Sequence, residues 1–231
     1  MSLRSKAGPG IAAVVFDLDG VLIDSELVWA EVKRSVAEEA GGHWHVNAQR
    51  EMLGMSSLEW SSYMRDRLGV PMDPDRISSA VAERVATQYR RELPLLPGAV
   101  EAVRSLAPCW PLAVASSANR SLIDLVVELA GLADAFQATV SSEEVGRGKP
   151  APDVYLEAAR LLAVDPVACA AVEDTANGIR SAHAAGMAVI AIPNRDFPPE
   201  PEALRLASRV LDSLTELTPG LLARFVSEQT L

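Results

Sequence analysis

Short apolar runs that alternate with amphipathic stretches constrain the fold of this chain more than any other feature. The runs read as strands at 11–16, 111–115, 136–140, 168–172, 187–192 and 208–211, with helices expected at 98–107, 119–130, 152–163 and 175–185. Alternating β and α units of this length predict a parallel sheet covered by helices on both faces. Hydrophobic residues make up 49% of the 231-residue chain, which is enough to fill such a core.

The first two expected strands are separated by a long segment without a convincing strand. The stretch that begins at "DSELVWAEVK" opens with acidic residues and ends at a glycine pair, as helix start and stop signals do. The later stretches "SSLEWSSYMRDRLGV" and "DPDRISSAVAERVATQYRREL" are helical in pattern as well, and the Pro-rich "LPLLPG" returns the chain to the sheet. We therefore expect an all-helical insert directly after the first strand.

The net charge and the lack of targeting signals restrict the kinds of molecule that this chain is expected to bind. The formal net charge is −10, and no basic stripe is present that could meet nucleic-acid phosphates. An anionic substrate must therefore be received by a local positive group. No apolar stretch is long enough for a membrane span or a signal peptide, so we expect a cytoplasmic protein without membrane contact.

Polar side chains capable of chemistry follow four of the expected strands. In chain order they are Asp17 and Asp19, then Ser116, Ser117 and Asn119, then Lys149, and finally Glu173 and Asp174. In open parallel sheets, ligands bind beyond the carboxyl ends of the strands. The four sets are therefore expected to meet at one edge.

Together these groups suit phosphoryl transfer. Several carboxylates share one pocket as anions only when a cation sits among them, and short oxygen ligands without His or Cys suit Mg²⁺. An aspartate beside Mg²⁺ and a lysine is an activated nucleophile, and a second aspartate can serve as general acid and base. Lys149 is one of only three lysines among 21 basic residues, so a lysine is not the default cation here.

Each of these motifs also has a structural interpretation. A single DxDG segment is often a turn, and Ser-Ser-Ala-Asn is a common helix start. The pair Glu173 and Asp174 could simply complement a helix dipole. The order in which the motifs occur, rather than any one of them, favours catalysis.

Four segments resemble the motifs of the haloacid dehalogenase superfamily, in its β-phosphoglucomutase-like phosphatase branch. They are "FDLDGVLIDSE", "ASSAN", "GKPAPDVYL" and "VEDTANGIRSAHAAGM". The resemblance implies an α/β fold with a Rossmann-like parallel-sheet core, formed by 1–23 and 93–231. It also implies that 24–92 form a four-helix-bundle cap that closes over the substrate.

The same resemblance implies a role for each motif residue. Asp17 is expected to be the nucleophile that becomes an aspartyl-phosphate, and Asp19 the general acid and base. Asp17, the backbone carbonyl of Asp19 and Asp174 are expected to hold Mg²⁺, with Glu173 in or just outside that shell. The phosphate is expected to meet Ser116, the Ser117 amide and Asn119, with Lys149 opposite.

Two positions in the cap help to distinguish a phosphatase, which transfers the phosphoryl group to water, from a phosphomutase, which returns it to the sugar. Trp29 stands where β-phosphoglucomutases carry a gating histidine, and Ser57 where they carry an arginine. These departures favour water as the acceptor, although a phosphomutase stays open as the alternative. A non-catalytic receiver module is disfavoured, because receivers are shorter, lack the cap and lack an acid two residues after the phosphorylated aspartate.

The sequence therefore predicts a Mg²⁺-dependent phosphomonoester hydrolase. Its expected substrate is a small phosphorylated metabolite, a sugar or polyol phosphate, and the protein is expected to be a monomer. Cap residues are expected to select the substrate. The candidate contacts are Glu26, Met55, Ser56 and Ser57.

Overall fold

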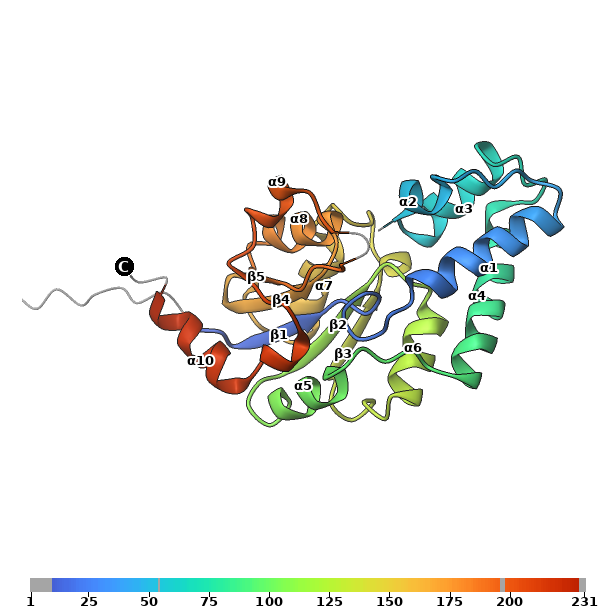
Figure 1. Ribbon diagram of the computed structural model, residues 1–231. Helices are drawn as coiled ribbons and strands as arrows, with labels where there is room; N and C mark the ends of the chain where they lie inside the picture. The colour runs from blue at the N-terminus through green and yellow to red at the C-terminus, as the bar shows by residue number, and fades with distance from the viewer. Residues whose placement is uncertain (1–9, 54, 196–197, 229–231) are drawn as a thin grey trace, which may run out of the picture.

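Six parallel strands form one sheet in the computed structural model, which describes residues 10–53, 55–195 and 198–228 (Figure 1). The strands are β1 (Ala13–Phe16), β2 (Leu112–Ser116), β3 (Ala138–Ser141), β4 (Cys169–Glu173), β5 (Ala188–Ala191) and β6 (Arg209–Val210). Their order is β3-β2-β1-β4-β5-β6, which is the order of a Rossmann-type sheet. The chain order reverses between β1 and β4, so this is where such a sheet binds its ligands.

Helices cover both faces of the sheet. They are α5 (Ala99–Leu106), α6 (Arg120–Leu129), α7 (Asp153–Leu161), α8 (Ala176–Ala184), α9 (Pro201–Leu204) and α10 (Pro219–Glu228), with short 3-10 turns at Ser142–Glu144, Pro166–Ala168 and Leu214–Glu216. Successive residues of β1 point to opposite faces: Val14 and Phe16 join a core with α5 and α6, and Val15 joins a second core with α7 and α8. The continuous apolar runs in the sequence follow from this burial on both sides.

Four further helices lie between β1 and β2 and form the helical insert. They are α1 (Glu26–Glu39), α2 (Ala48–Met52), α3 (Ser57–Asp66) and α4 (Pro74–Arg91). The long α4 packs against both α1 and α3 (Figure 1). Local signals set their ends: Gly41 follows α1 with φ of +86°, and the Ser56 hydroxyl caps α3 in a reciprocal arrangement with Glu59.

The two segments that join this insert to the sheet are hydrogen-bonded to each other. The Asp24 amide donates to the Pro94 carbonyl at 2.7 Å, and the Leu96 amide donates to the Leu22 carbonyl at 3.0 Å. Ile23 and Leu95 form an antiparallel bridge between them. The entry to and the exit from the helical insert therefore form one paired ribbon.

These observations confirm the predicted fold class. Each of the six expected strands is present, and their order places the helical insert after the first one. The short helices α2 and α9 and the helix α10 were not predicted. Within the described part of the chain, no helix is both long and apolar enough to cross a membrane.

Candidate active site

Three buried carboxylates meet where β1 and β4 end. Asp17 follows β1, and its amide donates to the Val172 carbonyl of β4 at 2.9 Å. Glu173 is the last residue of β4 and Asp174 follows it. One carboxylate oxygen from each of the three lies within 4.8 Å of the other two. The topology therefore brings together acidic groups from two distant sequence motifs.

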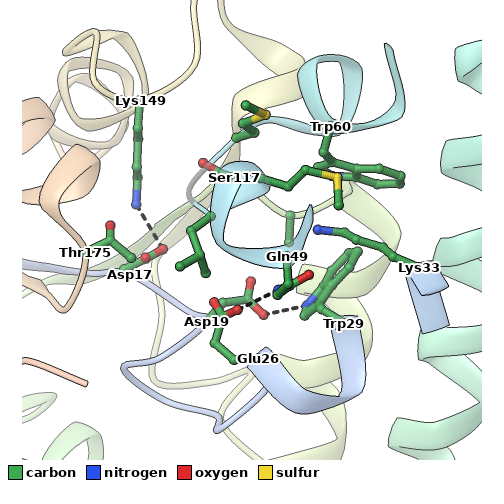
Figure 2. Close-up of a pocket in the computed structure, with 14 residues that line it drawn as sticks. Asp17, Asp19, Glu26, Trp29, Lys33, Gln49, Trp60, Ser117, Lys149 and Thr175 are labelled. Carbon is green, nitrogen blue, oxygen red and sulfur yellow. Dashed lines mark hydrogen bonds and ion pairs between the residues drawn. The ribbon is translucent and has the colours of Figure 1, made fainter. Parts of the chain in front are cut away.

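Lys149 provides the positive charge of this cluster. Its side chain comes from the loop before α7 and is almost fully buried, with 3% of the residue exposed. The ammonium lies 3.0 Å from Asp17 Oδ1 and 2.6 Å from Glu173 Oε1 (Figure 2 draws the first contact). Lys149 thus joins the third motif to the first and the fourth.

Burial shifts the ionisation of this cluster strongly. Burial raises the pKa of Asp17 to about 8, with Glu173 and Asp19 adding to the rise and Lys149 opposing it. Burial likewise raises the pKa of Asp174 well above its usual value. Burial alone lowers the pKa of Lys149, but Asp17 and Glu173 outweigh this effect, so its net pKa is raised. One ammonium therefore does not compensate all of the carboxylates, and a further cation would stabilise their charged forms.

The carboxylate of Glu173 is already engaged by protein groups. Its Oε1 accepts hydrogen bonds from Lys149 at 2.6 Å and from the Tyr155 hydroxyl at 2.8 Å. Its Oε2 accepts from the backbone amides of Asp174 and Thr175 at 3.0 and 3.2 Å. Gly178 leaves the space for this carboxylate, because a Cβ there would lie 1.8 Å from Oε1. Glu173 therefore has little capacity left for a metal ion.

Asp174 differs from Glu173 in this respect. Its Oδ1 is buried and has no hydrogen-bond partner, which is costly unless a ligand satisfies it. The backbone of Gly20 approaches this carboxylate so closely that a Cβ would lie 2.0 Å from Oδ2. A free, buried carboxylate beside Asp17 is a donor set that fits a hard divalent cation with oxygen ligands.

The side chain of Asp19 is held from the helical insert. Its Oδ1 accepts a 2.6 Å hydrogen bond from the Ser25 hydroxyl and a 3.0 Å hydrogen bond from Trp29 Nε1. Figure 2 shows Trp29 below the pocket with its ring nitrogen directed at this carboxylate. Trp29 therefore both lines the pocket and fixes the orientation of Asp19.

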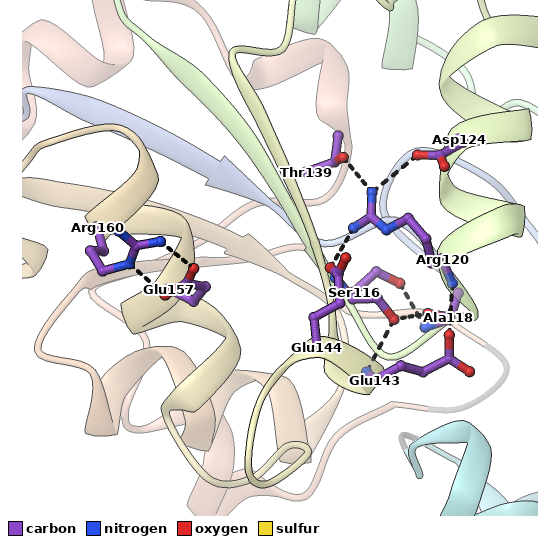
Figure 3. A network of polar contacts seen from close by, with 10 residues as sticks. Ser116, Ala118, Arg120, Asp124, Thr139, Glu143, Glu144, Glu157 and Arg160 are labelled. Atoms are coloured by element: carbon purple, nitrogen blue, oxygen red, sulfur yellow. Dashed lines mark hydrogen bonds and ion pairs between the residues drawn. The ribbon is translucent and has the colours of Figure 1, made fainter.

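The residues after β2 occupy three different settings. Ser116 is fully buried, and its hydroxyl accepts from the Ala118 amide at 3.0 Å (Figure 3). Ser117 lines the pocket, and its buried hydroxyl has no partner. Asn119 lies outside the pocket lining, and its amide donates to Ser78 and Glu143 at 2.9 and 2.7 Å. In this arrangement the Asn119 side chain contacts α4 and the core, and its expected phosphate contact stays a prediction.

The loops around Asn119 are braced by a polar network. Figure 3 shows the Arg120 guanidinium directed at Glu144, Asp124 and Thr139, with nitrogen–oxygen distances of 2.8, 3.0 and 2.6 Å. The Ser141 hydroxyl donates to the Ala118 carbonyl at 2.6 Å. These contacts hold the loop that carries Ser116 and Ser117 against the end of β3.

A pocket of about 60 Å³ lies between the insert and the carboxylates. It is lined by Asp17, Asp19, Glu26, Trp29, Lys33, Gln49, Met52, Leu53, Met55, Trp60, Ser117, Ala118, Lys149 and Thr175. Two of the four expected cap contacts, Glu26 and Met55, are among these residues. The other two, Ser56 and Ser57, lie instead where α3 meets the core, beside Gly148 and Glu143.

Sequence reasoning missed several residues of this pocket, above all Lys33. Figure 2 shows its ammonium between the rings of Trp29 and Trp60. The nitrogen lies 5.1 and 5.0 Å from the two ring centroids. Glu26, Trp29 and Lys33 are spaced as one face of a helix, and that spacing is a signal that could have placed Lys33 in the pocket. Trp60 and Tyr155 carry no comparable signal.

Comparison with known proteins agrees with this site. The family model for a haloacid dehalogenase-like hydrolase matches residues 11–186, which include the first three motifs and the fourth as far as Gly186. The chain belongs to the haloacid dehalogenase-like hydrolase family. This confirms the resemblance on which the expected roles rest, and it makes the chain an enzyme of the hydrolase class.

Two curated relatives differ in length from one another. Hexitol phosphatase B of Escherichia coli strain K12 is 33% identical over 216 residues, which cover 90% of this chain and 95% of the relative. The bifunctional riboflavin kinase/FMN phosphatase of Arabidopsis thaliana is 30% identical over 220 residues. This chain spans only 57% of the length of that second relative.

Solved structures share the same fold. CbbY of Rhodobacter sphaeroides in complex with phosphate superposes with a TM-score of 0.81 at 28% identity, covering 90% of this chain and 96% of that one. A mutant of the same protein was solved with xylulose-(1,5)bisphosphate. The β-phosphoglucomutase of Clostridium difficile reaches a TM-score of 0.82 over 95% of this chain and 98% of that one, and at 22% identity it supports the fold alone.

Proposed function

We propose that this chain is a Mg²⁺-dependent phosphomonoester hydrolase. The observation that carries the proposal is the arrangement of two aspartates two residues apart. Asp17 is buried beside Lys149, while Asp19 is held by Trp29 at the floor of the pocket. This arrangement supports Asp17 as the proposed nucleophile and Asp19 as the proposed acid for the leaving group.

In this proposal the reaction runs through two transfers. Asp17 attacks phosphorus, and Asp19 donates a proton to the departing alcohol oxygen. An aspartyl-phosphate forms on Asp17 as the ester bond breaks. Asp19 then takes a proton from water, whose oxygen attacks the same phosphorus. The bond between Asp17 and phosphorus breaks, which releases inorganic phosphate and restores the Asp17 carboxylate.

The remaining residues of the cluster bind and orient the phosphoryl group. Ser116 and the Ser117 amide are the proposed donors to phosphate oxygens, and Lys149 offsets the charge of these oxygens from the opposite side. Glu173 and Tyr155 fix the position of the Lys149 ammonium. Glu173 is therefore proposed as a positioning residue rather than a metal ligand.

Asp17, Asp174 and the backbone carbonyl of Asp19 are the proposed holders of the divalent cation. When bound, Mg²⁺ offsets the charge of the carboxylates and of the phosphoryl oxygens. The unpartnered Oδ1 of Asp174 supports this assignment. Replacing this carboxylate by a neutral amide in Asp174→Asn should remove the rise in melting temperature that Mg²⁺ gives to the native protein.

The proposed substrate is a small phosphorylated metabolite, a sugar or polyol phosphate. The name of the Escherichia coli hexitol phosphatase, one third identical to this chain, supports a polyol phosphate. Residues 24–92 are the proposed cap that excludes water during the reaction. The monomeric state and the cytoplasmic location stay predictions.

The proposal is tested by phosphate release from a panel of sugar, polyol and nucleotide monophosphates. We expect release with Mg²⁺, little release with EDTA, and a loss of at least about a thousandfold in Asp17→Asn. Asp134→Asn is the matched control, because Asp134 is exposed and distant in sequence from all four motifs. Release that persists in Asp17→Asn would overturn the proposed nucleophile.

The phosphomutase alternative is examined with the same preparation. Its signature is isomerisation of β-glucose 1-phosphate that depends on an added sugar bisphosphate. If that isomerisation occurs while no monophosphate on the panel is hydrolysed, the hydrolase proposal is wrong.

A further inference from the structure

Lys33 is a buried cation that the proposed reaction does not use. It lies on α1, and only 5% of its surface is exposed. Of the residues that the structure describes, no carboxylate oxygen lies within 4.0 Å of its ammonium, which lies 5.1 and 5.0 Å from the ring centroids of Trp29 and Trp60. Aromatic rings attract an ammonium but do not neutralise it.

The position of Lys33 relative to the catalytic groups is informative. Lys33 and Lys149 line the same pocket, and Lys149 is the cation beside Asp17. Figure 2 shows the two ammonium groups on opposite sides of the pocket, with Asp19 and Gln49 between them. The pocket therefore has one positive group at the phosphoryl end and another at the far end, where the leaving group would lie.

The only acidic pocket residue near Lys33 on the same helix face is Glu26, and it has a different partner. Its Oε2 accepts a 2.9 Å hydrogen bond from Gln49 Nε2. Glu26 is separated from Lys33 by more than ion-pair distance, so it does not satisfy the ammonium directly. Burial lowers the pKa of Lys33 to about 8, with Glu26 and Asp19 opposing the shift, which is the direction expected of an uncompensated cation.

We propose that Lys33 binds a second anionic group of the substrate, a carboxylate or a second phosphate on the leaving group. The inference rests on the proposed function, because the first anion is the phosphoryl group attacked by Asp17. It narrows the substrate class to phosphomonoesters with negative charge at both ends. Glu26, at the side of the same pocket, is free to accept a hydrogen bond from a substrate hydroxyl between them.

The proposal adds to the sequence interpretation of the cap. There, Trp29 and Ser57 in place of the histidine and arginine of the mutases favour water as the acceptor. Lys33 places a cation in the cap at a different position, one turn further along α1 than Trp29. A second anion is thereby compatible with hydrolysis, since no gating histidine is required to bind it.

The test compares pairs of phosphomonoesters that differ only in the second charge. Suitable pairs are glycerol 1-phosphate with 3-phosphoglycerate, glucitol 6-phosphate with 6-phosphogluconate, and fructose 6-phosphate with fructose 1,6-bisphosphate. The first two pairs probe a carboxylate and the third probes a phosphate. We expect kcat/KM to be higher for the charged member of at least one pair by about tenfold to a hundredfold, the range for a charge-assisted hydrogen bond.

Variants then assign that preference to Lys33. In Lys33→Met the ratio of kcat/KM for the charged and neutral members should fall close to one, and Lys33→Arg should restore most of it. Arg34→Met is the matched control, because Arg34 is the exposed neighbour on the same helix and its loss removes the same charge. A direct readout is the affinity of the Asp17→Asn protein for the charged member, measured by calorimetry with and without the Lys33→Met change.

Three outcomes would overturn the proposal. One is a native enzyme that favours the neutral members of all three pairs. Another is an equal loss for both members in Lys33→Met, which is the result expected if Lys33 only supports the packing of the two tryptophans. The third is an equal change in Arg34→Met. Failure of the proposed function is distinguishable, because then no member of any pair, charged or neutral, would release phosphate.

Discussion

The Ser57 hydroxyl donates a 2.8 Å hydrogen bond to Glu143 Oε1, and this contact joins the helical insert to the core. Ser57 is the first residue of α3, and Glu143 lies in the 3-10 turn after β3. Asn119 donates to the same oxygen at 2.7 Å and to Ser78 of α4 at 2.9 Å. A single core carboxylate thus takes part in contacts with two helices of the insert, which favours the arrangement in which the pocket is covered.

Ser57→Ala should weaken that closed arrangement without disturbing the catalytic groups. We expect kcat/KM to fall about three- to tenfold, the equivalent of one lost hydrogen bond, while the melting temperature changes little. Steady-state kinetics with the best substrate of the panel measure the effect. Ser79→Ala is the control, because the Ser79 hydroxyl donates only to the Asp75 carbonyl of its own helix. An equal kcat/KM in the two variants would contradict a role of the Ser57 hydrogen bond in keeping the pocket covered.

Gly20→Ala should abolish the proposed metal site. The residue has a φ of +76°, and its Cβ would lie 2.0 Å from Asp174 Oδ2, so the carboxylate must move. Gly41→Ala is the matched control: φ is +86°, but a Cβ there meets nothing within 4 Å. We expect backbone strain of about 1 kcal/mol in both proteins, seen by urea unfolding, and loss of Mg²⁺-induced stabilisation in Gly20→Ala only. Retained Mg²⁺ stabilisation in Gly20→Ala would argue against Asp174 as a ligand.

Tyr155→Phe removes a hydroxyl that donates to Glu173 and leaves the ring in place. The free energy of unfolding should fall by about 1 to 2 kcal/mol, because Glu173 Oε1 is left with Lys149 alone. Tyr155 does not touch the pocket, so kcat should fall far less than in Asp17→Asn. Urea denaturation and kinetics with the same substrate measure the two effects. A loss of activity as large as that of Asp17→Asn would show that the hydroxyl has a direct role.

The lowered pKa of Lys33 predicts a pH dependence of stability. The pKa is about 8 in the folded protein and 10.5 in an unfolded chain, so between these values the unfolded state binds more protons. The free energy of unfolding should therefore gain a rising contribution between pH 8 and 10.5, up to about 3 kcal/mol. This contribution of Lys33 is measured as the difference in free energy of unfolding between the native protein and Lys33→Met at each pH. A difference that stays constant over this range would contradict the burial of an uncompensated ammonium.

The strands could be predicted from sequence because their signal is local. The strands β1, β2, β4 and β5 are fully buried, and the β1 side chains are divided between two cores on opposite faces of the sheet, so the apolar pattern and the environment coincide. The four motifs could be brought to one edge for a similar reason, since parallel strands end on the same side. Asp17, Lys149, Glu173 and Asp174 meet as expected.

The parts that sequence reasoning missed depend on packing between distant segments. The environment of Lys33 is completed by Trp60, which α3 supplies, and no local pattern on α1 specifies that neighbour. The same holds for Tyr155, whose hydroxyl reaches Glu173 across the sheet edge. Asn119 was expected at the phosphate from its position after a strand, but the sequence did not indicate that its amide would donate to Ser78 of the insert.

The paired ribbon formed by the two connecting segments has an evolutionary consequence. Because Asp24 and Pro94 are hydrogen-bonded neighbours, the helical insert begins and ends at almost the same point of the sheet. A replacement of any length could leave and re-enter there without changing a single strand contact. The insert can therefore be exchanged or remodelled as a unit when substrate preference diverges. The carboxylates at the ends of the strands can stay unchanged in the process.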